Sequence, residues 1–186
     1  AEIGAPNWFS LGDRDLAACL YRREFLAAGG RLTDAQAQIA RGLGLRARVL
    51  PMTDEAVRTK VLTDVGRRDL QEYLILDGGK PQVLGVELDG IAEAQPTTEV
   101  VNALRAADVI VVGPSNPVIS IGPILALPGM RDAIQASPAP VLAVSPYVGG
   151  RIVKGPTDKF MEALGRPTTA AGVASLYAGL IHAMVV

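Results

Sequence analysis

The sequence predicts an α/β fold in which helices cover both faces of a parallel sheet, with a small mixed α+β lobe that contains a hairpin. Two strands, "VIVV" from Val109 and "VLAV" from Val141, carry no polar residue and are separated by a helical segment. Continuously apolar strands that alternate with helices are typical of a parallel sheet buried on both faces. The length of 186 residues fits one domain with a substantial core, so we take residues 1–186 as a single domain.

The first half of the chain mixes helical and strand patterns. Glycines that follow amphipathic runs mark the ends of helices, and alternation of polar with apolar residues marks strands. These patterns predict helices over 15–30 and 32–44, a strand over 46–52, a hairpin over 57–76 that turns at 64–66, and a strand over 82–90. We expect residues 46–90 to form a hairpin-containing lobe inserted within the domain.

The second half has the rhythm of a parallel α/β sheet. Its patterns predict helices over 97–108, 129–137, 158–165 and 168–181, and strands over 109–116, 140–150 and 183–186. No internal repeat interrupts this order.

Composition excludes several classes of protein. A net charge of −1, from 18 basic and 19 acidic residues, argues against a nucleic-acid partner. No run of about 18 apolar residues is present, so we expect no membrane span and a cytoplasmic protein. The single cysteine, Cys19, and the single histidine, His182, cannot build a disulfide or a Cys/His zinc site, so any metal would have oxygen ligands. We expect Cys19 to be a small buried apolar residue and His182 to be structural.

Polar residues follow both apolar strands of the predicted sheet. Gly113, Ser115 and Asn116 follow the first strand, and Ser145 follows the second. Ligands of open parallel sheets bind beyond the carboxyl ends of the strands, where hydroxyl groups and free N–H groups suit an anionic oxygen. Turn chemistry alone would explain one such stretch. Two matching stretches at one edge make an anion site an equally good interpretation.

Two further motifs carry charge near a predicted helix start. In "VKGPTDKF", Lys154 and Lys159 flank a turn that opens a helix, and Pro156 fits the first helical position. The spacing is not that of a phosphate-binding Walker loop, and a capped helix with solvated lysines explains the motif by itself.

The "LGDRD" motif places Asp13, Arg14 and Asp15 at the start of the first predicted helix. The carboxylates could cap that helix, hold the arginine against a ligand, or supply oxygen ligands to Mg²⁺. Capping is the simpler interpretation of a bare tripeptide.

Taken together, the motifs resemble a known family. "WFSLGDRDLA", "LPMTDEAVRTKV", "GPSNPVISIGPILALPGMRDAI", "VLAVSPYVGGRIVKGPTDKFMEALG" and "GVASLYAGLI" occur in the order found in the 2-phospho-L-lactate transferase (CofD/FbiA) family of coenzyme F-420 biosynthesis. The similarity extends over nearly the whole chain. It implies a Rossmann-like domain with a smaller lobe, usually assembled as a homodimer.

The resemblance also implies a reaction. Members of this family transfer a phospholactyl group, or in bacteria a phosphoenolpyruvyl group, from a guanosine diphosphate-linked donor to the deazaflavin Fo. GMP is released and Mg²⁺ is required. Such a transfer depends on charge neutralisation and positioning more than on a covalent nucleophile.

Residue roles carry over from the matching motifs. The resemblance assigns the nucleotide or its phosphates to Gly113, Ser115, Asn116, Ser145, Lys154, Gly155 and Lys159. It assigns the deazaflavin or the metal to Asp13, Arg14 and Asp15, with Asp158 orienting Lys159 or the metal.

The family's Gly-rich loop and its Asp-rich segment are missing from this sequence, and family members continue past Val186. We therefore expect the chain to be a fragment, with the main metal ligands outside it.

Two alternatives remain. A non-catalytic UDP-sugar-binding regulator of the gluconeogenesis-factor (YvcK-like) family shares the fold and a related loop, although "PSNPVISIGP", "GDRD" and "KGPTDK" suit the transferase better. A plain NAD-binding domain is disfavoured because no G-x-G-x-x-G follows a strand.

Overall fold

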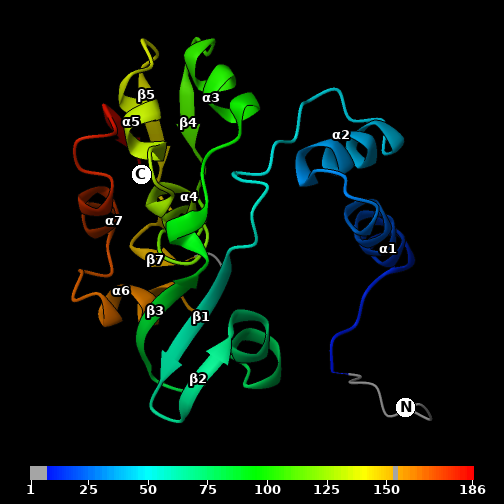
Figure 1. Ribbon diagram of the computed structural model, residues 1–186. Coiled ribbons are helices and arrows are strands. Elements are labelled where there is room, and N and C mark those ends of the chain that lie inside the picture. Colours follow the sequence, from blue (N-terminus) through cyan, green and yellow to red (C-terminus); the bar gives the residue numbers. More distant parts are fainter. Residues whose placement is uncertain (1–7, 153–154) are drawn as a thin grey trace.

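A computed structural model describes residues 8–152 and 155–186. Its centre is a parallel sheet in the order β4-β5-β8, formed by Ile110–Val112, Val141–Val144 and Ala183–Val185. The helices of this half are α3 (Thr98–Arg105), α4 (Ile121–Ala126), α5 (Met130–Gln135), α6 (Thr157–Ala163) and α7 (Ala170–Leu176). The α/β class and the parallel sheet are confirmed, and Figure 1 shows the strands side by side.

One face of the parallel sheet forms the core. Val141 and Ala143 of β5 are buried in a cluster that includes Met130, Tyr177 and Phe160 from three helices. The opposite face leaves Val111 58% exposed and Val185 60% exposed. The covering of both faces expected from the apolar strands is therefore not seen within the described residues. Alternation along each strand places these exposed valines on the face opposite the core.

The smaller lobe is an antiparallel sheet in the order β2-β1-β3, formed by Arg58–Thr63 (β1), Gly66–Asp69 (β2) and Val83–Asp89 (β3). Its strands lie within the predicted lobe, and the hairpin turns at the predicted position. The second limb is shorter than predicted, because a turn of π-helix over Glu72–Leu76 follows β2. That turn buries Tyr73 completely against Phe160, with the ring centroids 5.7 Å apart. The gain from packing an aromatic ring into the core explains why the strand pattern stops there.

Further elements connect these sheets. A 3₁₀ turn over Ile91–Glu93 precedes α3, and β6 (Tyr147–Val148) pairs with β7 (Arg151–Ile152) after β5. The long strand predicted over 140–150 is thus a short strand followed by a tight hairpin. Gly149 and Gly150 form its turn with φ values of 57° and 77°, a conformation that glycine adopts without strain. A short helix that the sequence did not predict, α4, begins at Ile121.

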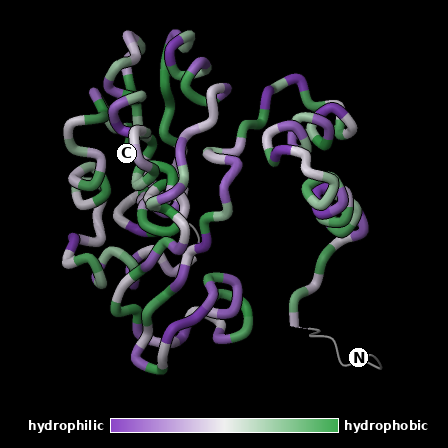
Figure 2. Tube along the Cα trace, in the orientation of Figure 1, coloured by the Kyte–Doolittle hydropathy of each residue, from purple (hydrophilic) through white to green (hydrophobic). Residues whose placement is uncertain are grey.

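The first two helices form an arm beside the body. α1 (Asp13–Ala27) and α2 (Leu32–Gly42) pack against each other, and Figures 1 and 2 show them set apart from the two sheets. α1 has no buried residue, and Cys19 is exposed, so the expectation that Cys19 is buried was wrong. The strand predicted over 46–52 was also wrong. This segment is irregular and contains Pro51, which has no N–H group to donate to a sheet.

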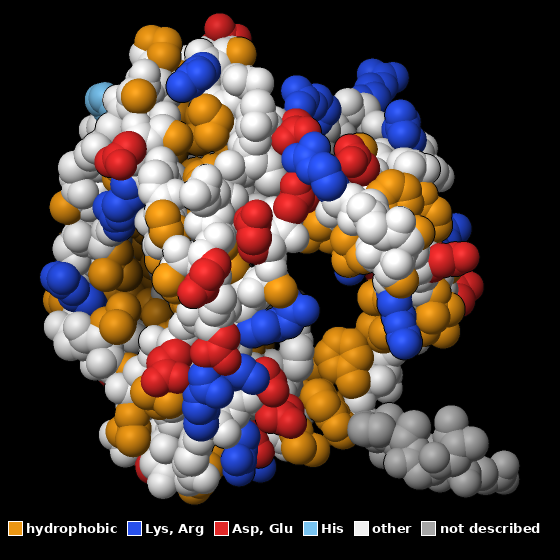
Figure 3. Space-filling view, in the orientation of Figure 1, with side chains coloured by type: hydrophobic (Ala, Val, Ile, Leu, Met, Phe, Trp, Pro, Cys, Tyr) orange, Lys and Arg blue, Asp and Glu red, His pale blue; other side chains and the backbone are white. Residues whose placement is uncertain are grey.

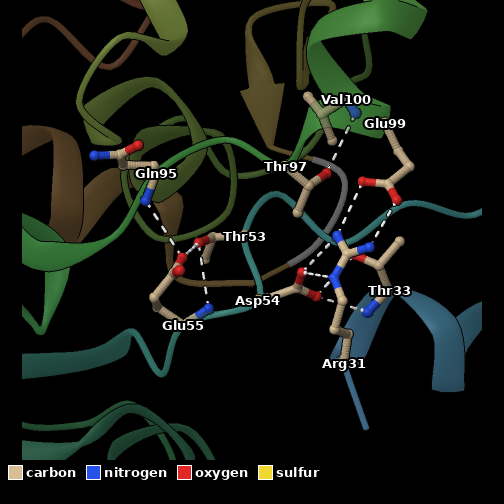
Figure 4. Close-up of polar contacts among 9 residues, drawn as sticks. All are labelled: Arg31, Thr33, Thr53, Asp54, Glu55, Gln95, Thr97, Glu99 and Val100. Carbon is tan, nitrogen blue, oxygen red and sulfur yellow. Dashed lines mark hydrogen bonds and ion pairs between the residues drawn. The ribbon is translucent and has the colours of Figure 1, made fainter.

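A polar network joins the arm to the body (Figure 4). Arg31, just before α2, donates to both carboxylate oxygens of Glu99 in α3 at 2.9 and 3.0 Å, and to Asp54 at 2.8 Å. The backbone N–H and hydroxyl of Thr33 also donate to Asp54, each at 2.8 Å. Burial of Asp54 favours its neutral form, but these hydrogen bonds outweigh burial and hold its pKa below the ordinary value.

The same network continues towards α3. The Thr53 hydroxyl donates to the carboxylate of Glu55, which also accepts from the N–H of Gln95 at 3.3 Å. Thr97 caps α3 by accepting from the N–H of Val100 at 3.2 Å. The start of α2, the segment before β1 and the start of α3 are therefore connected by side chains rather than by a sheet.

We expect the anchoring by Glu99 to depend on pH. Its hydrogen bonds with Arg31 lower the pKa of Glu99 from 4.5 to about 2. A carboxylate whose pKa is depressed in the folded state stabilises that state fully above its unfolded pKa. This contribution should disappear as the pH falls from about 4.5 towards 2. Glu99→Gln should therefore lower the urea unfolding midpoint at pH 7, and the difference from the unsubstituted protein should shrink below pH 4.5.

Glu93→Gln is the matched control, because Glu93 is exposed and forms no ion pair with another described residue. An unfolding midpoint that Glu99→Gln leaves unchanged at pH 7 would contradict the anchoring role.

Candidate ligand site at the carboxyl edge of the parallel sheet

The loop after β4 is built around the side chain of Asn116. Its carboxamide oxygen accepts from the N–H groups of Val118 at 2.9 Å and Ile119 at 3.1 Å. Its amide nitrogen donates to the hydroxyl of Thr157, the first residue of α6, at 3.2 Å. Asn116 thus holds its own loop and ties that loop to a helix 41 residues further along the chain. Because its carboxamide is occupied in this way, Asn116 positions the edge.

The turn after β5 is held in a similar way. Ser145 is buried, and its hydroxyl accepts from the N–H of Tyr147 at 3.0 Å and donates to the carbonyl of Tyr147 at 3.1 Å. The Tyr147 hydroxyl donates to a carboxylate oxygen of Asp158 at 2.6 Å. Burial, followed by the hydrogen bond to Asp158, raises the pKa of Tyr147 well above its ordinary value, so this tyrosine stays protonated.

Lys159 makes contacts that the sequence did not indicate. Its amine donates to the carbonyl oxygens of Gly79 at 2.6 Å and Lys80 at 2.7 Å, across the boundary between sheet and lobe. The Tyr73 hydroxyl donates to the same Gly79 carbonyl at 3.2 Å. Two of the three N–H bonds of Lys159 therefore hold the lobe against α6.

The remaining residues predicted to bind the nucleotide are Gly113, Ser115, Gly155 and Lys154. Gly113 and Ser115 lie in the loop after β4, where Ser115 is exposed and its N–H donates to the carbonyl of Gly113 at 2.8 Å. Gly155 is exposed with a φ of 81°, just before α6. Lys154 lies outside the described residues.

The predicted acidic motif lies elsewhere. Asp13, Arg14 and Asp15 form the exposed first turn of α1, where the N–H of Arg14 donates to Asp13 at 2.8 Å. Arg14 lines a cavity of about 650 Å³ between α1 and α2, beside Tyr21. Hydrogen bonds to Thr157 and through Tyr147 bring Asn116 and Ser145 to α6, which carries Asp158 and Lys159. The acidic motif lies on α1, which Figure 1 shows apart from the parallel sheet.

Sequence reasoning missed Tyr147 and Thr157 as members of this edge. Both are buried: Thr157 accepts a hydrogen bond from Asn116, and Tyr147 links Ser145 to Asp158. A signal for each was present, because Tyr147 follows Ser145 by two residues and Thr157 precedes Asp158. His182 has a structural place, since its ring Nδ1 accepts from the N–H of Val141 at 3.0 Å.

The charged groups of this edge do not form a complete metal centre. Within residues 8–152 and 155–186, no three His, Cys, Asp or Glu side chains gather as ligands. The same part of the chain holds no helix both long enough and apolar enough to cross a membrane. The edge offers the exposed hydroxyl of Ser115 beside the hydrogen-bonded side chains of Asn116, Ser145 and Tyr147. This arrangement suits an anionic ligand.

These features define an α/β protein with a polar ligand edge at the carboxyl ends of its parallel strands. The family model of 2-phospho-L-lactate transferase CofD matches residues 6–186, and the chain belongs to this family.

Curated relatives carry two related names. The chain is 39% identical to the 2-phospho-L-lactate transferase of Methanosarcina acetivorans, over 99% of this chain and 59% of that protein. It is 40% identical to the enzyme of the same name from Methanopyrus kandleri, over 95% of this chain and 56% of that protein. It is 42% identical to the phosphoenolpyruvate transferase of Kitasatospora aureofaciens, over 92% and 55%. The chain therefore spans less than two thirds of the length of these relatives.

Solved structures give the same fold. A crystal structure of a Bacillus halodurans protein superposes with a TM-score of 0.63 at 20% identity, covering 96% of this chain and 56% of that one. A second crystal structure of that same protein, there described as a member of the UPF0052 family, gives a TM-score of 0.54 at 24% identity, covering 67% of this chain and 40% of that one. These similarities support the fold.

Asn116 should position the edge through two sets of hydrogen bonds, those within its own loop and the one to Thr157. Different substitutions can remove these sets separately. Asn116→Ala removes both the loop bonds and the link to Thr157, and should lower the free energy of unfolding by about 1–3 kcal/mol. Asn116→Asp keeps the acceptor for Val118 and Ile119 but loses the donor to Thr157, so it should cost less. Urea unfolding measures both. Equal stabilities of the alanine variant and the unsubstituted protein would contradict the role.

Lys159 should stabilise the contact between lobe and body. Lys159→Met leaves two carbonyl oxygens without their charged donor, and should lower the free energy of unfolding by about 1–3 kcal/mol. Lys80→Met is the control, because Lys80 contributes only its backbone carbonyl to the contact and should change stability by less than about 0.5 kcal/mol. Thermal and urea unfolding of the two variants decide the point, and equal losses would argue against a specific contact.

Proposed function

We propose that this chain forms the nucleotide-binding part of a transferase that acts in coenzyme F-420 biosynthesis. The transferred group is a phospholactyl or phosphoenolpyruvyl unit, the donor is linked through guanosine diphosphate, the acceptor is the deazaflavin Fo, and GMP leaves. The observation that carries the proposal is the family membership over residues 6–186, combined with a polar edge at the ends of β4 and β5.

The proposed chemistry asks the edge to hold a diphosphate. A hydroxyl oxygen of the acceptor would attack phosphorus and the bond to the GMP oxygen would break. Catalysis would come from positioning and charge neutralisation. Among the described residues, the exposed hydroxyl of Ser115 and the exposed backbone at Gly155 would contact phosphate oxygens. Gly113 and Lys154 remain proposed contacts of the same nucleotide. Asn116, Ser145 and Lys159 would act through the frame that they hold.

Mg²⁺ remains the proposed cofactor. When bound, it would neutralise charge on the diphosphate. Asp158 is exposed at this edge and could offer one carboxylate oxygen, since the other accepts from Tyr147. The described residues do not complete the coordination, and we assign no step to the ion. Asp13, Arg14 and Asp15 remain proposed contacts of the deazaflavin or the metal.

A cytoplasmic homodimer is part of the same proposal. Light scattering coupled to size-exclusion chromatography measures the oligomeric state directly.

The relatives are named as transferases of two different groups, phospholactate and phosphoenolpyruvate. Experiment must therefore determine which three-carbon acid the donor carries. The protein that carries this chain, at its natural length, is incubated with Fo, Mg²⁺ and either guanosine-diphospho-lactate or its enolpyruvyl analogue. Mass spectrometry should show the phosphoryl-linked acid on Fo together with GMP, and the productive donor names the acid. Absence of product with both donors, together with thermal stabilisation by a UDP-sugar but not by GDP, would favour the alternative of a non-catalytic regulator.

Ser115 should contribute to the reaction rather than to folding. Ser115→Ala removes an exposed hydroxyl without a described side-chain partner, and should lower kcat/KM by roughly 10- to 100-fold, the loss of one hydrogen bond to a charged group. Its unfolding midpoint should not change. Ser120→Ala is the matched control, since Ser120 is exposed five residues along the same loop. Unchanged turnover in the Ser115 variant would remove this residue from the site.

A further inference from the structure

A second group of positive charges lies on the arm, away from the edge of the parallel sheet. Arg41 in the last turn of α2, together with Arg46 and Arg48 in the segment that follows, lines a cavity of about 310 Å³. In the space-filling view, Lys and Arg side chains gather around this end of the arm (Figure 3). None of the six described residues assigned to the nucleotide lines this cavity.

The three guanidinium groups form no ion pair within the part of the chain that the structure describes, although Arg48 is close enough to Glu99 to help lower the pKa of that carboxylate. Six ion pairs are formed among those residues, and none includes Arg41, Arg46 or Arg48. Two carboxylates line the cavity, those of Asp34 and Glu99. Glu99 already accepts two hydrogen bonds from the guanidinium group of Arg31. Positive charge therefore exceeds the negative charge available to balance it.

The local backbone explains why these arginines share one cavity. Residues 46–52 do not join a sheet, so Arg46, Ala47 and Arg48 pass α2 as an irregular segment. Residues 46 and 47 form a bend, and both Arg46 and Arg48 line the cavity on either side of the small Ala47. The Arg31 network fixes the neighbouring start of α2 beside α3. The cavity wall is thereby held at the start of α2.

We propose that this cavity is a second anion site, separate from the edge of the parallel sheet, and that it takes a small phosphorylated molecule. Guanidinium groups bind phosphate through paired N–H bonds, and they remain charged at all physiological pH values. The cavity volume is at the lower end of the range for small-molecule sites. A net charge of −1 for the chain disfavours a nucleic acid at the same surface.

Inorganic pyrophosphate is the probe. Calorimetric titration at low ionic strength should show binding with a Kd on the order of 1 mM or tighter. Hydrogen exchange should show slower exchange of the amides of residues 43–50 when pyrophosphate is present. Arg46→Ala/Arg48→Ala should weaken this event by about tenfold or more, since each replacement removes a charged donor.

Arg23→Ala/Arg105→Ala is the matched control. It removes the same charge from two exposed arginines that do not line the cavity. It should leave the affinity within about threefold. Circular dichroism and the unfolding midpoint establish that both double variants are folded.

Three outcomes would overturn the proposal. Pyrophosphate does not bind, the control variant loses as much pyrophosphate affinity as the Arg46/Arg48 variant, or pyrophosphate does not slow amide exchange in residues 43–50. The measurement requires neither Fo nor a donor. Ser115→Ala should keep this binding event, so a failed transferase assay and a failed anion site are distinguishable.

Discussion

The structure depends on one buried face of a three-stranded parallel sheet. Val141 and Ala143 of the central strand lie in a core formed with four helices and the π-helical turn of the lobe. Burial of this aliphatic face fixes the strand order β4-β5-β8, and the order brings the carboxyl ends of β4 and β5 together. The polar edge follows from that placement. The opposite face, around Val111, is exposed within the described residues, unlike the faces of most parallel sheets.

The polar groups of the edge divide into those that hold the frame and those that remain open. The side chains of Asn116, Ser145 and Lys159 each make two or more hydrogen bonds to protein atoms. A loop held in this way loses little conformational freedom when a ligand binds, so more of the contact energy is available for affinity. The residue types that suit an anion site in sequence therefore serve here mainly to shape it. Ser115 stays free for direct contact.

The sequence predicted the elements whose formation is local. The apolar runs gave the three parallel strands, and the Asp64–Gly66 turn placed the hairpin. The misplaced elements were decided by distant contacts. The second limb of the hairpin gives way to a π-helical turn because Tyr73 packs on Phe160, and Cys19 is exposed because α1 has a partner only in α2. Arg31 and Glu99 are 68 residues apart in the sequence, and Lys159 and Gly79 are 80 apart. Local sequence patterns therefore could not predict these contacts.

The position of the arm decides whether the acidic motif of residues 13–15 can belong to the same site as the edge. Figure 3 shows an open gap between the arm and the lobe, and the arm is anchored to the body at the Arg31 network. Arg31 is 47% exposed, and exposed ion pairs contribute little free energy in water. The arm therefore joins the body through a few exposed polar contacts, whereas the parallel sheet is held by a buried core.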